Sequence, residues 1–244
     1  MCLKRFLFAL VATVAFHSNL IAQDDPKAVI QKAIDAQGGK DALVKAQKCR
    51  RTSSGVFSFG QTQNFSDEFV ISLPDKLRLT INLTMAERLV LCMNGDKGWS
   101  SASGIAQELP KEKIAELKDE AYFLRVINLV DLLGQNAKLA SLPESKVNGA
   151  AVRGVKASIQ GGTEVSLYFD KITGLLSKAE RKSKQSGVDV LKGTLFSDYK
   201  SFGPVKMPTS EAQLLGGNKI ADIKNIQYTL EATQEDSLYQ LPSK

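Results

Sequence analysis

The sequence predicts an α+β protein built on one strongly curved antiparallel sheet of about ten strands. Two observations predict this class. Helical periodicity is limited to the start of the chain and to one segment in the middle, whereas the remainder alternates apolar and polar residues with a period of two. Residues that favour turns separate these alternating runs, as expected for consecutive antiparallel strands. No linker rich in proline or serine interrupts the chain, so a single folded domain is expected.

Residues 1–22 have the features of a secretory signal peptide. Lys4 and Arg5 precede an apolar run from Phe6 to Phe16, and a small residue, Ala22, follows it. The apolar run is too short to span a bilayer. We therefore expect cleavage after Ala22 and a protein that is periplasmic or secreted, and soluble once the signal peptide is removed.

The mature domain, residues 23–244, would lack the usual catalytic equipment. Its formal charge would be (32 − 2) − 26 = +4, because two basic and no acidic residues are removed. His17, the only histidine, would be lost, and with it any Ser-His-Asp triad or histidine metal site. Cys49 and Cys92 would remain in an oxidising compartment, where a disulfide between them is an open question. We expect no enzyme activity, no metal and no cofactor.

Two helices are predicted at the start of the mature domain, over residues 25–39 and 40–47. Asp25-Pro26 is a typical helix start, and Gly38-Gly39 is a typical stop. After Arg51 the periodicity changes from helical to two. Four antiparallel strands are predicted from the runs GVFSFG, NFSDEFVISL, KLRLTINL and ERLVLCMN.

The stretch MNGDKGW, residues 93–99, could be a phosphate-binding loop or a hairpin turn. A phosphate loop requires a helix directly after its glycines, but the residues after Trp99 have no helical periodicity. Asn94-Gly95 instead favours a tight hairpin turn. Trp99, the only tryptophan, would lie on the returning strand, where it either packs in the core or lines a cavity.

The segment from Pro110 to Gly134 is the one long helical stretch among the strands. Its second half, from Tyr122 to Leu133, is apolar nearly all round, which is unusual for a surface helix. It is therefore either a covered core helix or a lid over an apolar groove. Strands resume after Leu142-Pro143 and continue to a final capping turn in EDSLYQLP.

The charged residues do not indicate nucleic-acid binding or catalysis. The run KAERKSK, residues 178–184, is the densest basic stretch, and its alternation predicts the solvated face of an edge strand rather than a patch for anionic lipid. Adjacent carboxylates such as Asp67-Glu68 would point to opposite faces of a strand. Glu235-Asp236 would lie in a turn.

The order of several short motifs resembles the periplasmic lipoprotein carriers of the LolA/LolB type and their relatives, the outer-membrane lipoprotein-sorting and RseB-like proteins. These motifs are IDAQGGKDAL, NGDKGW, YFDKITGLL, FSDYKSF followed by VKMPTSEAQ, and SLYQLP. The resemblance implies an unclosed half β-barrel of about ten to eleven strands around a helical lid. It also implies an apolar cavity for acyl chains and transfers no catalytic residue.

The sequence and this resemblance together suggest a non-enzymatic binding protein for a lipid or a lipoprotein acyl chain. Envelope membrane proteins would be further partners, and nucleic acid would not. The alternative is an envelope sensor or structural interaction protein that uses the same fold without lipid cargo. The residues expected to line the apolar cavity are Phe57, Phe59, Phe69, Leu79, Trp99, Tyr122, Phe123, Val126, Ile127 and Val130.

Overall fold

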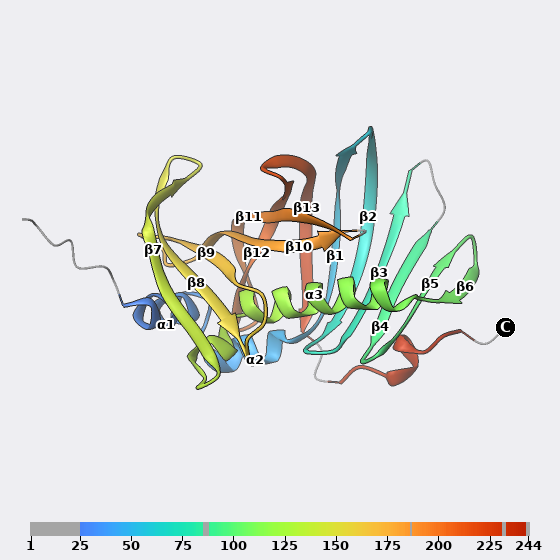
Figure 1. Cartoon of the computed structure of the whole chain (residues 1–244), viewed down its shortest axis with the longest axis horizontal. Coiled ribbons are helices and arrows are strands. Elements are labelled where there is room, and N and C mark those ends of the chain that lie inside the picture. The colour runs from blue at the N-terminus through green and yellow to red at the C-terminus, as the bar shows by residue number, and fades with distance from the viewer. Residues whose placement is uncertain (1–24, 85–87, 186, 231–232, 243–244) are drawn as a thin grey trace, which may run out of the picture.

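A computed structural model describes residues 25–84, 88–185, 187–230 and 233–242, so the expected signal peptide, residues 1–22, lies outside the described residues. One antiparallel sheet of thirteen strands, rather than ten or eleven, curves around a long helix (Figure 1). Its order is β6-β5-β4-β3-β2-β1-β13-β12-β11-β10-β9-β8-β7, so β6 and β7 are its two edges. The strands are β1 Lys48–Phe59, β2 Gln61–Ser72, β3 Lys76–Leu83, β4 Leu89–Asn94, β5 Lys97–Ala102, β6 Ile105–Glu108, β7 Ala137–Val147, β8 Ala150–Ile159, β9 Val165–Asp170, β10 Leu176–Gln185, β11 Val188–Phe202, β12 Val205–Leu215 and β13 Asn218–Leu230.

The two expected N-terminal helices are confirmed as α1, Pro26–Ala36, and α2, Lys40–Ala46. The Asp25 side chain caps α1 by accepting a hydrogen bond from the backbone N–H of Lys27. Apolar residues on one side of α1 are buried in the main core, which explains why this short segment is ordered as a helix. No helix in the described residues is long and apolar enough to span a membrane.

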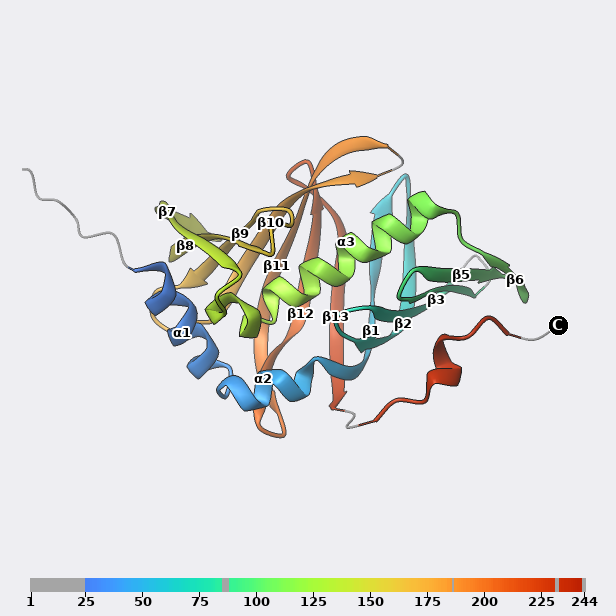
Figure 2. The same ribbon diagram turned by 60° about the horizontal axis from the view of Figure 1, so that its bottom comes forward.

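The expected helix from Pro110 to Gly134 is divided in two. Helix α3, Lys111–Ile127, lies across the curved sheet, and a short 3-10 helix, η1 Val130–Leu133, follows it (Figure 2). Leu129 adopts a left-handed conformation with φ of 70°, which ends α3. Leu129 and Leu132 are both completely buried, so the break places two large apolar side chains in the main core.

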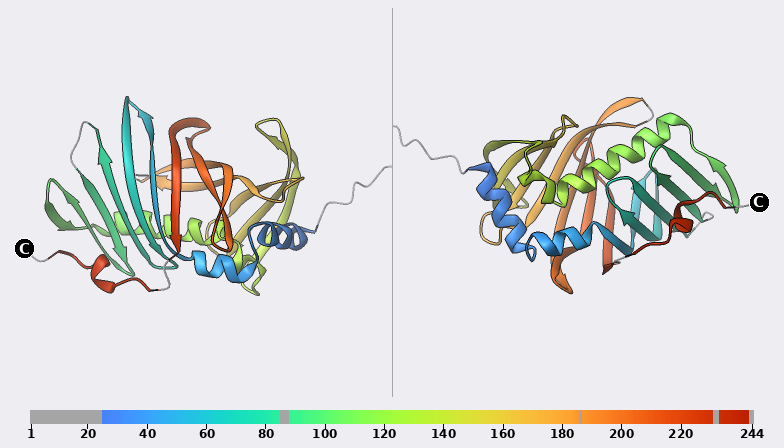
Figure 3. Two further views of the ribbon diagram at one scale, coloured as in Figure 1. Left: turned by 180° about the vertical axis from the view of Figure 1, so that it is seen from behind. Right: turned by 90° about the horizontal axis from the view of Figure 1, so that it is seen from below.

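The sheet has an inner face, which we define as the side toward α3, and an opposite outer face. Phe69 and Met93 belong to the inner face and share a cluster with Ala121 of α3. Val70 and Cys92, the neighbours of these two residues along the strands, belong to the outer face. The C-terminal segment with η2, Asp236–Tyr239, covers the outer face of β3 and β4 (Figure 3), so the expected final turn is confirmed.

The basic run 178–184 does not form the solvated face of an edge strand. It lies in β10, which pairs with β9 up to Arg181 and with β11 along the whole run. Arg181 and Ser183 are buried on the inner face, whereas Lys182 and Lys184 are exposed on the other. The expected alternation along the run is confirmed, but α3 covers the side of the strand that carries Arg181.

The hairpin expected in MNGDKGW is confirmed, with a shift of one residue in its turn. Asn94 pairs with Lys97, so the two-residue loop is Gly95-Asp96 and not Asn94-Gly95. Gly95 has φ of 62°, and its backbone N–H donates to the Asp75 carbonyl at 2.9 Å. A β carbon at Gly95 would meet nothing within 4 Å, so the requirement for glycine there is conformational.

Replacing Gly95 with valine is expected to destabilise the protein by about 1–3 kcal/mol, because a β-branched residue is strained at positive φ. Thermal unfolding would show a melting temperature several degrees below that of the unsubstituted protein. Gly95→Asn is the matched control, since asparagine tolerates this conformation, and it should lose much less. Equal melting temperatures for the valine variant and the unsubstituted protein would contradict the hairpin geometry.

Candidate ligand cavity between helix α3 and the sheet

A cavity of about 100 Å³ lies between α2, α3 and the inner face of the sheet. Most of its lining side chains are apolar, and the polar ones are Gln37, Arg51, Asn128 and Glu211. This volume is below the roughly 300 Å³ at which small-molecule pockets usually begin. The apolar lining consists of Leu43, Ala46, Cys49, Ile71, Leu73, Leu124, Ile127, Leu176, Phe196, Tyr199, Met207, Pro208 and Tyr228.

The cavity lies where β12 and β13 separate. The ladder between these strands runs from the pair Leu215 and Asn218 to the pair Glu211 and Ile223. Both strands continue beyond Glu211 and Ile223, and Pro208 and Tyr228 in these continuing segments line the cavity. Proline has no backbone N–H for a ladder bond, which fits the loss of pairing in this part of β12.

A second pocket, of about 280 Å³, lies at the end of α3, beside η1 and the start of β7. Its lining includes Lys40, Arg125, Asp131 and Asn136. Arg125 and Asp131, which both line this pocket, form an ion pair with each other. This second pocket is larger, but its lining mixes charged and polar residues with apolar ones, so the first cavity is the one whose lining suits an apolar ligand.

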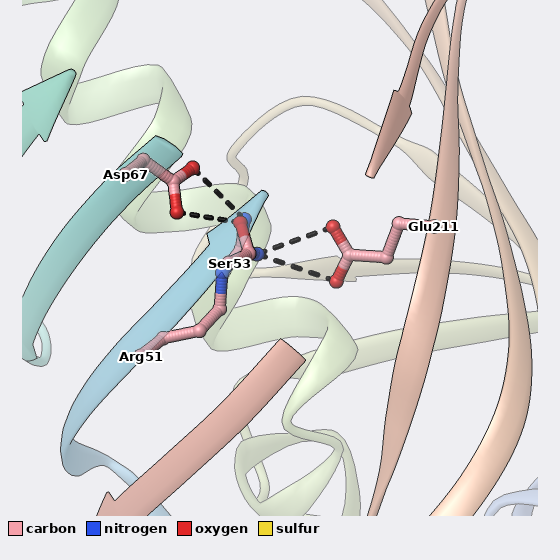
Figure 4. Close-up of polar contacts among 4 residues, drawn as sticks. All are labelled: Arg51, Ser53, Asp67 and Glu211. Carbon is pink, nitrogen blue, oxygen red and sulfur yellow. Dashed lines mark hydrogen bonds and ion pairs between the residues drawn. The ribbon is translucent and has the colours of Figure 1, made fainter. Parts of the chain in front are cut away.

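Three charged side chains meet on the inner face beside the cavity (Figure 4). Arg51 of β1 donates from Nη1 to both carboxylate oxygens of Glu211, at 3.1 and 3.3 Å. Its Nη2 lies 3.6 Å from Asp67 Oδ2, and Ser53 donates to the other oxygen of Asp67. The three charged side chains are each at most 10% exposed, and their formal charges sum to −1.

The charge state of this cluster is set by burial and by the paired carboxylates. Burial would lower the pKa of Arg51, but Glu211 and Asp67 outweigh it and raise the pKa, so Arg51 is a permanent cation. Burial, and then the negative charge of Glu211, raises the pKa of both Tyr199 and Tyr228. Both tyrosines therefore keep neutral hydroxyl groups beside the cavity at physiological pH.

Arg181 of β10 holds α3 against the inner face. Its Nη2 lies 2.7 Å from Glu120 Oε2 and its Nε lies 3.2 Å from Asp119 Oδ2. Its guanidinium carbon lies 3.9 Å from the centre of the Phe123 ring, and Ser183 donates to Asp119. The Arg181 side chain is only 3% exposed, so a buried cation holds α3 in the present arrangement in addition to apolar contacts.

The structure brings together all five expected lining residues of the α3 region. Tyr122, Phe123, Val126, Ile127 and Val130 all belong to the main core or pack against it. Of these five, Ile127 lines the apolar cavity and Val130 lines the polar pocket. The Tyr122 hydroxyl accepts a hydrogen bond from the Ile159 N–H at 2.9 Å. Most of this segment is therefore covered core.

The expected lining residues on the strands are dispersed. Phe69 and Leu79 are paired on β2 and β3, and Phe69 packs on the inner-face cluster with Ala121. Phe57 packs in a separate cluster with Phe65 and residues of β13. Phe59 lies at the end of β1, and its side chain falls outside the described part of the structure.

Trp99 does not line a cavity with α3, contrary to the expectation from the sequence. It pairs with Cys92 and therefore lies on the outer face, where it packs with Val70 and Tyr239. Its indole Nε1 donates to the Tyr239 carbonyl at 3.2 Å. The pairing register decides this placement, because a shift of one residue along β5 would move Trp99 to the other face.

The possible disulfide between Cys49 and Cys92 is also wrong, since both cysteines are buried and neither is disulfide-bonded. The strand registers align Cys49 with Met93 across three strand intervals, through β2 and β3. Three intervals span about 14 Å, whereas a disulfide requires Cα atoms within about 7 Å. Cys92 also points to the outer face, whereas Cys49 belongs to the inner-face cluster.

Cys92 is expected to resist alkylation in the native protein. Its side chain is completely buried, and burial raises the pKa of the thiol to about 12. Iodoacetamide at pH 8 should therefore leave Cys92 unmodified in the folded protein and modify it after unfolding in guanidinium, as peptide mass spectrometry can measure. Rapid native modification of Cys92 would mean that the C-terminal segment does not cover it.

The charged cluster of Arg51, Asp67 and Glu211 is not among the sites predicted from the sequence. One signal was present: period-two alternation places Arg51 on the same strand face as Cys49 and Ser53, away from exposed Thr52. An arginine at an inward position requires a buried anionic partner. That partner, Glu211, is 160 residues away, and no local pattern identifies it.

Comparison with protein-family models and with curated proteins found no match to this sequence. By structure, the chain is similar to a LolA superfamily protein from Nitrosomonas europaea, with 11% identity, a TM-score of 0.53 and coverage of 88% of this chain and 97% of that one. It is also similar to a putative outer membrane lipoprotein-sorting protein domain from Vibrio parahaemolyticus, with 10% identity, a TM-score of 0.50 and coverage of 88% and 97%. A DUF1329 family protein from Desulfovibrio piger has 14% identity, a TM-score of 0.50 and coverage of 89% and 100%.

These likenesses establish the fold class, a curved antiparallel sheet that surrounds a helix. The fold is similar to that of a LolA superfamily protein of known structure, in line with the resemblance that the motif order in the sequence suggested. The identities of 10–14% do not extend this likeness beyond the fold.

Proposed function

We propose that this protein is a non-enzymatic binding protein that holds an apolar ligand, a lipid or a lipoprotein acyl chain, between α3 and the inner face of the sheet. The observation that carries the proposal is the apolar cavity between α2, α3 and the separated strands β12 and β13. Apolar residues of α3, including Leu124 and Ile127, form one wall, and residues of β12 form another.

Burial of an acyl chain in this place requires no charged contact. Each methylene group removed from water contributes about 0.8 kcal/mol, so a long chain supplies on the order of 10 kcal/mol. The present cavity of about 100 Å³ admits only part of such a chain. We therefore infer that α3 moves outward during loading and refills the groove on release, which limits the affinity to a reversible range.

The assignment as a carrier is supported by fold and by expected location. One protein of similar structure is described as a putative outer membrane lipoprotein-sorting domain. An N-terminal segment with signal-peptide features would place the mature domain in the periplasm or outside the cell. Envelope membrane proteins are the proposed donors and acceptors of the cargo.

Native mass spectrometry of the protein purified from its own envelope, followed by lipid extraction, tests the proposal. The carrier function predicts a stoichiometric lipid that copurifies and is released by organic solvent. A mass equal to that of the polypeptide alone, in preparations that retain native fold, would contradict it. That result would favour an envelope sensor or structural interaction protein with the same fold.

A further inference from the structure

Two buried polar atoms of residues that line the cavity have no hydrogen-bond partner among the described residues. They are the acceptor Oε1 of Gln37 and the donor Nε–H of Arg51. Gln37 is 7% exposed and Arg51 is 9% exposed, so neither side chain has ready access to bulk solvent. Buried polar groups in proteins are nearly always paired, because an unpaired one costs about 1–3 kcal/mol.

We propose that the cavity recognises a neutral acylglycerol, whose ester carbonyl accepts from Arg51 Nε and whose free hydroxyl donates to Gln37 Oε1. This inference rests on the proposed function, since it assigns the polar end of the same apolar ligand. A saturated hydrocarbon chain would leave both wall atoms unpaired. A simple alkyl ester has an acceptor for Arg51 but has no donor for Gln37.

Gln37 and Arg51 belong to different elements and contact different parts of β12. Gln37 ends α1, and its backbone carbonyl accepts from the N–H of Lys206 at the start of β12. Arg51 meets the same strand further along, at Glu211. A ligand that pairs with both side chains therefore needs its donor and its acceptor on separate atoms, as the hydroxyl and carbonyl of an acylglycerol are.

The local charge selects a neutral ligand over an anionic one. The cluster of Arg51, Asp67 and Glu211 has a formal charge of −1, and Arg51 already pairs with both carboxylates. Tyr199 and Tyr228 remain neutral, so they add no positive charge. A fatty-acid carboxylate would enter a buried region of like charge, which is unfavourable at low dielectric.

Isothermal titration of the purified protein with three ten-carbon probes tests the assignment. Monodecanoylglycerol should bind about fivefold more tightly than methyl decanoate, as expected for one added hydrogen bond, and decanoate at pH 8 should bind most weakly. In Gln37→Met the ratio between the two esters should fall to about one, with the affinity for methyl decanoate unchanged. Gln31→Met is the control, because Gln31 lies on the exposed side of α1.

Arg51→Lys provides an independent second variant, since it keeps the charge and removes the Nε donor. Arg51→Lys should weaken the binding of both esters, whereas Gln37→Met should weaken only the binding of monodecanoylglycerol. Equal binding of the two esters to the unsubstituted protein would overturn the acylglycerol assignment and leave the proposed function standing. If none of the probes binds, both the acylglycerol assignment and the proposed function are contradicted. Failure of Gln37→Met to fold, or a melting temperature well below the parent, would also overturn the assignment, because Gln37 would then be structural.

Discussion

Replacing Arg51 with methionine is expected to destabilise the protein by about 3–5 kcal/mol, the usual cost of removing one partner from a buried ion pair. The variant would leave the carboxylates of Asp67 and Glu211 without the cation that lies between them. These side chains are 7% and 9% exposed, so water cannot replace the lost partner. Equilibrium unfolding in guanidinium chloride would measure the loss as a lower midpoint.

Two controls separate charge from side-chain volume. In the triple variant Arg51→Met, Asp67→Asn, Glu211→Gln no unpaired charge remains, so most of the lost stability should return. Arg50→Met removes the adjacent arginine, which is paired with Glu68 on a more exposed surface, and should cost only about 1 kcal/mol or less. Similar small losses for Arg50→Met and Arg51→Met would contradict the buried cluster.

Replacing Ile127 with aspartate is expected to weaken binding of a fluorescent fatty-acyl probe by about a hundredfold, or about 2.8 kcal/mol. Ile127 lines the apolar cavity from α3 and is only partly buried, so the variant can remain folded. A carboxylate in this wall would have to be desolvated or protonated before an acyl chain could enter. Titration of the probe, with circular dichroism to verify folding, would measure the effect.

Val44→Asp is the matched control for this substitution. Val44 lies on α2 next to a cavity residue, Leu43, but its own side chain is 44% exposed. The Val44→Asp variant should bind the probe as tightly as the unsubstituted protein. Phe123→Asp is a poorer choice, because Phe123 is buried in the main core under Arg181 and its replacement would unfold the domain. Equal affinity of the Ile127 and Val44 variants would place the ligand elsewhere.

The fold was largely predictable because its signals are local. Alternation identified the strands, and Asp25 and Gly38-Gly39 marked the ends of α1. The helix break at Leu129 was missed, since a leucine with positive φ is stabilised by tertiary burial and not by its own preference.

The candidate site was less predictable because it depends on strand register and on distant partners. Period-two alternation gives two faces to each strand but does not say which face meets α3, so Trp99 was assigned to the wrong one. The cavity arises from the separation of β12 and β13, and its polar cluster joins β1 to β12. No pattern within one segment of the sequence indicates the separation of β12 from β13 or the contact between β1 and β12.

The most direct test of an apolar ligand site between α3 and the inner face is photo-crosslinking with a fatty-acyl chain that carries a diazirine near its end. We predict saturable labelling, competed by unlabelled lipid, and mapped by peptide mass spectrometry to the cavity walls at Leu124, Ile127 and Met207. Trp99 emission should change little, because this residue lies on the outer face under Tyr239. Absence of saturable labelling, or labelling concentrated around Trp99 and Tyr239, would contradict the account.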